Sequence, residues 1–359
     1  MIMKRKIFGI FISLMLMTAF FTTAQKINNE LIKNETEEVN IILFDEVNVP
    51  IWEVGNMWEY QVDEIIIDFE EPELYIHIEG KIDAFTLEVV KVTENFYDLD
   101  FNAPVSGNYE LYTDFGDGPI NITGELKNTN IEGVIVYNKY ELAIKQIHAE
   151  ISGRLTLKIV EQPYFDSSFL PDIPIPADII LDTELSNPYP IIEFPLNTSK
   201  CWGLPYTNFS LGGTIESPWL KIANILNNIA RIPGVIPLLA TLLKTDPELL
   251  ENISDVLYDI LPVIDIEYLL NTYVGTGNTF EIPEVPPILC CFGMDNVTVP
   301  AREEPFEAFN ISLLMSGLGN MYYSSEVGNI IKIVGNFEEV LPFISNINAE
   351  LISYNYNPK

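Results

Sequence analysis

The sequence predicts an α+β fold that is mainly β: a large curved antiparallel sheet, half-barrel-like in shape, with a mid-chain helical insertion packed on one face. Three observations predict it. Apolar and polar residues alternate with a period of two from residue 51 to about 160, and again from about 278 to 356, as in half-buried antiparallel strands. Residues 217–273 carry apolar side chains at helical spacing instead. Because either β part alone would be a poorly closed unit, we expect residues 49–359 to form a single β domain.

The N-terminus predicts export. A basic segment at residues 4–6 precedes an apolar run of 15 residues, Ile7–Phe21, and small residues lead up to Ala24. This is the pattern of a signal peptide over residues 1–24, since a membrane-spanning helix needs about 20 apolar residues; an uncleaved anchor is the alternative. Residues 25–48 are polar and predict a flexible leader. We therefore expect an extracytoplasmic protein, secreted or at the cell surface, with no transmembrane span in the mature chain unless the signal stays uncleaved.

The first β part, residues 49–160, contains a change of strand phase. Apolar residues occupy even positions from Val134 to Ile144 and odd positions from Ile147 to Ile159. Such a slip indicates a β-bulge or a tight bend at Lys145-Gln146. The cluster FGDGP, residues 115–119, is typical of a turn between two strands.

Three segments complete the domain. Proline is frequent across residues 161–216 and predicts an extended crossing segment, because proline lacks the N–H that a sheet or helix interior needs. The helical insertion, residues 217–273, follows. Ser217-Pro218 and Asp246-Pro247 each place an N-cap residue before a proline at the first helical position. Residues 274–359 form the second β part.

No catalytic or metal-binding motif stands out. Both histidines, His77 and His148, fall on polar faces of predicted strands, so we interpret them as solvent-exposed strand residues. The chain lacks G-x-S-x-G, H-E-x-x-H and C-x-x-C motifs, and nothing singles out a carboxylate pair among its 52 acidic residues. The sequence therefore predicts a non-enzymatic protein without a metal site or a cofactor.

The three cysteines predict one disulfide. Cys201 is distant in sequence from the adjacent pair Cys290 and Cys291, and an exported chain favours a bridge. Neighbouring residues of a strand point to opposite faces, so only one of the pair can reach Cys201. We expect a Cys201–Cys290 bridge, with Cys201–Cys291 left open and a vicinal 290–291 bridge as the second alternative.

Charge and glycosylation motifs describe the surface. The formal net charge is −33 and becomes −36 when the three basic residues of the signal peptide are removed. A field of this sign repels nucleic acid and anionic lipid headgroups, so we expect no nucleic-acid partner. Seven N-x-S/T motifs fit a glycoprotein: Asn34, Asn121, Asn197, Asn208, Asn252, Asn296 and Asn310.

Two stretches resemble motifs of exported β-rich proteins of bacteria and archaea. WEVGNMWEY, residues 52–60, is similar to a W-x-x-G-x-x-W-x-Y strand. Residues 297–311 and 321–333 are similar to a V-P-A…F-x-A strand pair and a Y-Y-S-x-x-V-G-x-x-K hairpin, although Arg302 replaces the glycine after V-P-A. The resemblance implies aromatic anchors in the sheet interior and glycines at turns: Trp52, Trp58, Phe306, Tyr322, Gly55 and Gly328. It also suggests, by analogy of fold, the half-barrels of LolA- and LppX-type lipoprotein carriers.

Two functions fit these expectations. The first is a carrier or binder of an apolar or lipid-like small molecule, held between the curved sheet and the helical lid. Its expected apolar lining is Trp219, Ile222, Leu226, Ile236, Leu239 and Leu243. The alternative is a glycosylated cell-surface structural or interaction module, with a solid core, no ligand and cell-envelope proteins as partners. An apolar cavity of several hundred Å³ would favour the carrier.

Overall fold

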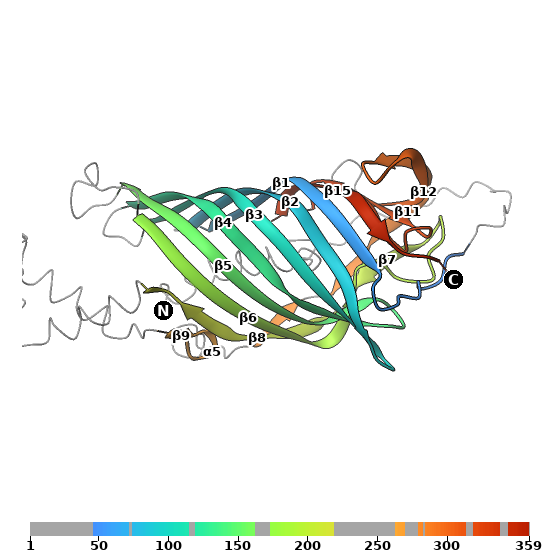
Figure 1. Cartoon of the computed structure of the whole chain (residues 1–359), viewed down its shortest axis with the longest axis horizontal. Helices are drawn as coiled ribbons and strands as arrows, with labels where there is room; N and C mark the ends of the chain where they lie inside the picture. Colours follow the sequence, from blue (N-terminus) through green and yellow to red (C-terminus); the bar gives the residue numbers. More distant parts are fainter. Residues whose placement is uncertain are drawn as a thin grey trace, which may run out of the picture.

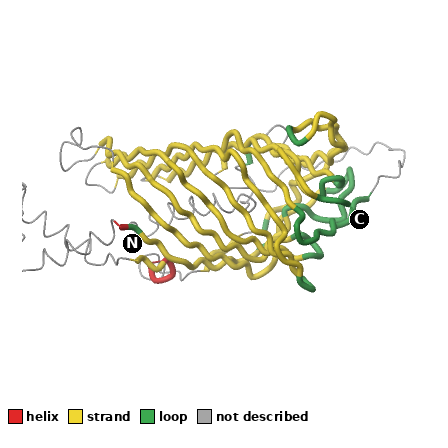
Figure 2. The backbone as a smooth tube through the Cα atoms, viewed as in Figure 1, coloured by secondary structure: helices red, strands yellow, loops and turns green. Residues whose placement is uncertain are grey.

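A computed structural model describes the chain over residues 46–71, 74–114, 119–161, 173–218, 263–269, 279–282, 284–313, 319–337 and 344–358. These residues form one antiparallel sheet of 15 strands. Figures 1 and 2 show the sheet as a long curved wall, with several of its loops gathered at one end.

The first six strands are long: β1 (Met57–Glu71), β2 (Leu74–Val92), β3 (Phe96–Asp114), β4 (Pro119–Asn138), β5 (Ala143–Glu161) and β6 (Ile173–Pro190). The remaining strands are β7 (Cys201–Leu204), β8 (Thr207–Glu216), β9 (Val263–Asp265), β10 (Thr279–Ile282), β11 (Val285–Val299), β12 (Arg302–Leu313), β13 (Gly319–Ser324), β14 (Asn329–Gly335) and β15 (Ile344–Asn355). Strand β4 has 20 residues, which at about 3.3 Å per residue gives a length of roughly 66 Å.

The strand order is β10-β8-β6-β5-β4-β3-β2-β1-β15-β14-β13-β12-β11-β7, and β9 pairs with β8 beside this path. The sheet is not closed by a hydrogen-bonded ladder between β10 and β7 in the described part of the chain. A short connection in the chain nevertheless links the two opposite edge regions of the sheet. Edge strand β7 ends at Leu204 and β8 begins at Thr207, near the opposite edge.

One face of the sheet is apolar, and the sheet curves around it (Figure 1). Along β1 the buried side chains alternate, as in Trp58, Tyr60 and Val62, and β3 repeats the pattern through Leu99 and Phe101. The alternation of the sequence thus becomes a single continuous core along the concave side.

The predicted α+β class is wrong, because the described chain is nearly all β. The one helix that lies wholly within the described ranges, α5 (Ile266–Leu269), has four residues. Just before it, residues expected in the helical insertion form strand β9, which pairs with β8. Short apolar runs cannot be assigned to helix or strand from periodicity alone. The segment Val263–Asp265 contains two β-branched residues and pairs with a free edge of β8. Residues 219–262 of the predicted insertion lie outside the described residues.

The β-bulge predicted at Lys145-Gln146 is confirmed. The pairing of β5 with β4 and with β6 shifts register between Ile144 and Gln146, so that Ile144 and Ile147 are both buried. The face expected for the preceding stretch is wrong, however. Strand β4 buries Ile135 and Tyr137 and leaves the even positions half-buried.

The proline-rich segment contains strands where we expected an irregular crossing. Strand β6 begins at Ile173 and includes Pro174 and Pro176. The pairing of β6 with β8 starts only at Asp178, so the two prolines lie where β6 has a neighbour on one side. A strand tolerates proline at such a position.

The disulfide between Cys201 and Cys290 is confirmed. The two cysteines are paired residues of β7 and β11, and Cys291 is a buried free thiol. The alternatives Cys201–Cys291 and Cys290–Cys291 are therefore wrong. The bridge joins residues 89 positions apart, and it fixes edge strand β7 to the sheet.

Candidate functional site

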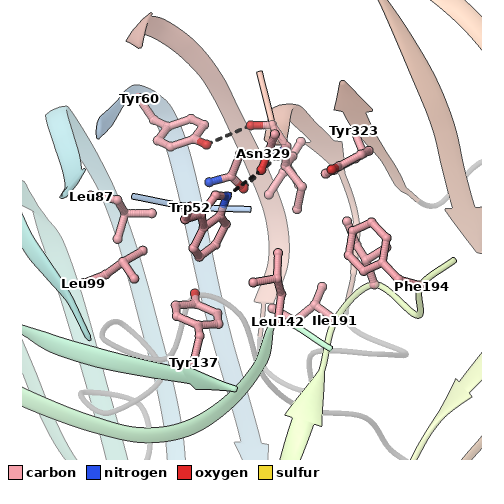
Figure 3. A pocket seen from close by; sticks show the side chains of 14 residues that line it. Trp52, Tyr60, Leu87, Leu99, Tyr137, Leu142, Ile191, Phe194, Tyr323 and Asn329 are labelled. Carbon is pink, nitrogen blue, oxygen red and sulfur yellow. Dashed lines mark hydrogen bonds between the residues drawn. The ribbon is translucent and has the colours of Figure 1, made fainter. Parts of the chain in front are cut away.

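A cavity of about 60 Å³ lies on the concave side of the sheet. Figure 3 shows it between the first strands and the β13–β14 hairpin. Its aromatic lining comes from five separate parts of the chain: Trp52, Tyr60, Tyr137, Phe194 and Tyr323. Its aliphatic lining comprises Leu87, Leu99, Leu142, Ile191, Ile192, Ile330 and Ile333. The turn residue Gly328 and the first residue of β14, Asn329, complete it.

Three side-chain hydrogen bonds join the two motifs that the sequence analysis singled out. Trp52 Nε1 donates to the carbonyl oxygen of Gly328 at 3.1 Å, and Trp58 Nε1 donates to that of Val327 at 2.9 Å. The hydroxyl of Tyr60 donates to the carbonyl of Ile330 at 2.8 Å. Residues 52–60, which run from a loop into β1, therefore bind the backbone of the β13–β14 hairpin, and both segments contribute residues to the lining of the cavity.

Trp52 is the centre of an aromatic cluster. Its ring centroid lies 5.0 Å from that of Trp58, 5.4 Å from Tyr97 and 5.7 Å from Tyr137. Tilted and edge-to-face arrangements at these distances are favourable. The cluster fixes the position of the indole at the floor of the cavity (Figure 3).

Glycines shape the turns at both motifs. Gly55 has a φ of 89° and Gly328 a φ of 65°, a region that favours glycine. At Gly328 an added Cβ would also lie 2.6 Å from the ring of Tyr356. Trp52, Trp58 and Phe306 are buried, as the resemblance implied. Tyr322 is half-buried, and its neighbour Tyr323 takes the interior position instead.

The hydrogen-bonding groups that face the cavity are of two kinds. Trp52 Nε1 and the Tyr60 hydroxyl are already paired with backbone carbonyls. The hydroxyl of Tyr323 is buried and has no hydrogen-bond partner among the described residues. Burial raises the pKa of Tyr60, Tyr137 and Tyr323 above that of an exposed tyrosine. All three phenols are therefore neutral at physiological pH.

Among the described residues, no charged side chain lines the cavity. The lining therefore offers shape, aromatic surface and neutral hydrogen bonds, and it offers no group that exchanges a proton near neutral pH. Sequence reasoning placed none of these lining residues in a cavity. Among them, Tyr137, Phe194 and Asn329 come from a strand end, a connecting segment and the start of β14. No periodic signal marks positions of that kind.

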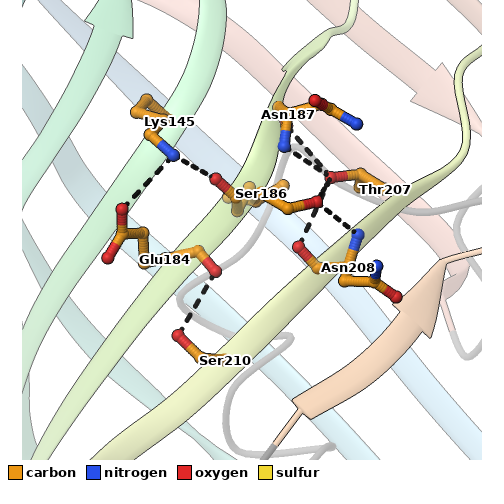
Figure 4. Close-up of polar contacts among 8 residues, drawn as sticks. Lys145, Glu184, Ser186, Asn187, Thr207, Asn208 and Ser210 are labelled. Atoms are coloured by element: carbon orange, nitrogen blue, oxygen red, sulfur yellow. Dashed lines mark hydrogen bonds and ion pairs between the residues drawn. The ribbon is translucent and has the colours of Figure 1, made fainter.

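A polar cluster on β5, β6 and β8 surrounds a bulge in β6, next to the bulge at Lys145-Gln146 in β5 (Figure 4). Residues 185–188 of β6 bulge opposite Lys145, whose ammonium contacts the carbonyl oxygen of Leu185. The Thr207 hydroxyl accepts from the backbone N–H of Asn187 at 3.2 Å and is 3.0 Å from its carbonyl oxygen. The bulged backbone groups are thus satisfied within the protein, so this cluster is structural.

The two histidines lie on the outer face, each beside an aspartate. His77 Nδ1 is 2.6 Å from Asp68 Oδ1, and His148 Nδ1 is 2.7 Å from Asp182 Oδ1. The hydrogen bond of its imidazole to the Asp182 carboxylate is the largest cause of a raised pKa at His148. Within the described ranges, no group of three or more His, Cys, Asp and Glu side chains could hold a metal ion.

The predicted glycosylation sites differ in their surroundings. Asn296 is exposed on β11. Asn121 and Asn310 are half-buried, and their amides donate to Glu110 at 3.0 Å and to Asp295 at 2.8 Å, respectively. The side-chain oxygens of Asn197 and Asn208 accept hydrogen bonds from Ser199 and Tyr206, in that order. Asn34 and Asn252 lie outside the described residues.

The six apolar lining residues expected from the sequence are not among those described: Trp219, Ile222, Leu226, Ile236, Leu239 and Leu243. The signal peptide and most of the leader also lie outside the described ranges. In the part of the chain that the structure covers, no helix combines the length and the apolar character needed to cross a membrane. The disulfide is compatible with an extracytoplasmic protein.

Comparison with known proteins gives no relative from which a function could be transferred. No protein-family model, no curated protein and no solved structure matches this chain significantly.

Proposed function

We propose that this chain is an exported, non-enzymatic protein that binds an apolar or lipid-like small molecule in the cavity beside Trp52. The observation that carries the proposal is an apolar, aromatic-lined cavity that holds an unpartnered hydroxyl. Leaving a buried polar group unpaired costs about 1–3 kcal/mol, so a partner that fills the cavity and pairs with the hydroxyl is favoured.

The size of the cavity limits what it holds. A buried water needs roughly 10–15 Å³ on this measure, and sites for drug-sized ligands occupy about 300–1,000 Å³. At about 60 Å³, the described cavity admits a small molecule or one end of a longer chain. The proposed site thus binds part of a lipid-like ligand, while the rest extends beyond these lining residues.

Export is supported by two independent features. The N-terminal sequence has the arrangement of a signal peptide. The Cys201–Cys290 bridge is of a kind that persists in oxidising compartments outside the cytoplasm.

Native mass spectrometry of the protein purified from its own host tests the proposal directly. We expect a bound apolar molecule that leaves on delipidation, and we expect the delipidated protein to bind a fluorescent fatty acid. The variant Leu87→Phe, which fills the cavity, should reduce that binding. Leu126→Phe, at a buried position that does not line the cavity, is the matched control. A protein that carries no lipid from its host and binds no fatty acid after delipidation would contradict the proposal.

The volume of about 60 Å³, well below the several hundred Å³ expected for a carrier, favours a second candidate: a glycosylated cell-surface structural or interaction module without a ligand. In that case the cavity holds only water, and the core serves to stiffen the sheet. This candidate predicts co-isolation with cell-envelope proteins and a mass that equals chain plus glycan. The same mass spectrum distinguishes the two.

A further inference from the structure

We infer that the ligand of this cavity is a neutral molecule with a hydroxyl or carbonyl group, which pairs with the hydroxyl of Tyr323. The inference rests on the proposed function and narrows it, because it ranks neutral alcohols and ketones above fatty acids, whose apolar chains the cavity would hold more weakly. Four observations support it.

The Tyr323 side chain is held rigidly. It comes from β13, it is 1% exposed, and its ring packs edge-to-face against Phe194 at 5.5 Å and beside Phe309 at 6.5 Å. Figure 3 shows its hydroxyl directed towards the centre of the cavity. An oriented group of this kind loses little entropy when a ligand binds.

The hydroxyl of Tyr323, on a residue that lines the cavity, has no hydrogen-bond partner among the described residues. By contrast, the indole of Trp52 and the hydroxyl of Tyr60 point at backbone carbonyls. A phenol can donate one hydrogen bond and accept another. It can therefore pair either with an alcohol or with a carbonyl oxygen.

Asn329 supplies a second polar group. Its Oδ1 accepts from the backbone N–H of Ile330 at 2.8 Å, which orients the amide at the start of β14. Its Nδ2 makes no hydrogen bond to any residue in the described ranges, and Figure 3 shows the amide at the edge of the cavity. Because Nδ2 only donates, it favours an oxygen acceptor on the ligand.

The lining excludes a charged headgroup. The described lining residues include no lysine, arginine or histidine, so a carboxylate inside the cavity would have no cation to pair with. Moving an unpaired charge out of water is far more costly than moving a neutral hydroxyl. The cavity should therefore discriminate 1-octanol from octanoate, although the two share an apolar chain.

Titration of the delipidated full-length protein with these two probes at pH 8, followed by calorimetry, tests the inference. We expect 1-octanol to bind more tightly than octanoate. Tyr323→Phe should weaken 1-octanol binding by roughly 2- to 12-fold, the factor that corresponds to a net hydrogen bond of about 0.5–1.5 kcal/mol. The variant should leave octanoate binding unchanged.

Tyr189→Phe is the matched control. Its hydroxyl is also buried without a partner, but Tyr189 does not line the cavity. Both variants should melt at or above the temperature of the native protein, because each removes an unpaired polar group, and only Tyr323→Phe should change 1-octanol binding.

The outcomes distinguish a failure of the inference about Tyr323 from a failure of the proposed function. Equal binding of both probes, or 1-octanol binding that Tyr323→Phe does not weaken, would overturn the inference and leave the proposed function intact. If neither probe nor a fluorescent fatty acid binds, and the protein from its host carries no lipid, the proposed function fails and the inference with it.

Discussion

Trp58 and Val327 are separated by 269 residues of sequence, yet the indole N–H of Trp58 donates to the carbonyl oxygen of Val327 at 2.9 Å. Trp58 is fully buried and lies on β1, whereas Val327 is in the turn between β13 and β14. This one bond joins β1 to a hairpin whose strands, β14 and β13, lie two and three positions away in the order β1-β15-β14-β13.

Trp58→Phe should destabilise the protein by about 2–4 kcal/mol, because the carbonyl of Val327 loses its donor and the smaller ring leaves a void. Urea denaturation measures the loss. Ile51→Ala, at an exposed position, should change the free energy of unfolding by less than about 0.5 kcal/mol. Equal effects of the two substitutions would show that the contact contributes little.

A glycine series separates backbone strain from steric overlap. Gly55→Ala adds only strain, since nothing lies within 4 Å of the new Cβ, and should cost about 1 kcal/mol. Gly328→Ala adds the overlap with Tyr356 and should cost about 2–3 kcal/mol or more. Gly212→Ala, where the nearest atom is 4.0 Å away, serves as the reference. A smaller loss for Gly328→Ala than for Gly55→Ala would contradict the packing described at Tyr356.

Removing the disulfide should lower stability by roughly 4–5 kcal/mol on the chain-entropy model, because the bridge closes a long loop. The double variant Cys201→Ala/Cys290→Ala tests this by thermal melting in the absence of reductant. Cys291→Ala should cost much less. In the folded protein the Cys291 thiol should resist alkylation, since it is buried and burial raises its pKa. Rapid labelling of Cys291 under native conditions would argue against its placement.

His148 should titrate above the ordinary histidine value, because Asp182 stabilises the imidazolium. The stabilisation that this pair gives the fold is complete below about pH 6.5 and is lost as the pH rises through the raised pKa. Proton NMR of the imidazole measures the titration. Asp182→Asn should move the pKa of His148 downward. An unchanged titration in that variant would mean that another group, such as Glu150, dominates.

Glycan occupancy should follow exposure. Asn296 is exposed and should be glycosylated in a host that modifies N-x-S/T motifs. Asn121 and Asn310 should stay unmodified, because their amide nitrogens are engaged with carboxylates. Glycopeptide mapping by mass spectrometry measures all three. Full occupancy at Asn121 with none at Asn296 would contradict the described face of the sheet.

The parts of the fold that the sequence predicted well are those governed by period-two alternation. It indicated strands over residues 51–160 and 278–356, although it assigned the long strand β6 to an irregular crossing segment. The phase slip at Lys145-Gln146 marked a real bulge, because one inserted residue exchanges the two faces of a strand. Opposite faces for Cys290 and Cys291 likewise followed from strand geometry.

The errors came from local patterns that tertiary pairing overrides. Residues 263–265 fit a helical period, but a free edge of β8 accepts them as a strand. Pro174 and Pro176 indicated a crossing segment, although a strand with one neighbour tolerates them. The cavity could not be foreseen either, since Tyr137, Phe194 and Asn329 meet only after the sheet has curved. The choice of Tyr322 over Tyr323 was a one-residue error in register.

The pairing of β1 with β15 has a consequence for how the chain folds. Asn355 at the end of β15 hydrogen-bonds to the carbonyl of Gly55, 300 residues earlier. The ladder between β1 and β15, at the centre of the sheet, can therefore form only after nearly all the intervening chain has been made. Contacts between residues so far apart in the sequence are slow to form. The edge of β1 that faces β15 therefore has no strand to pair with until β15 has been synthesised.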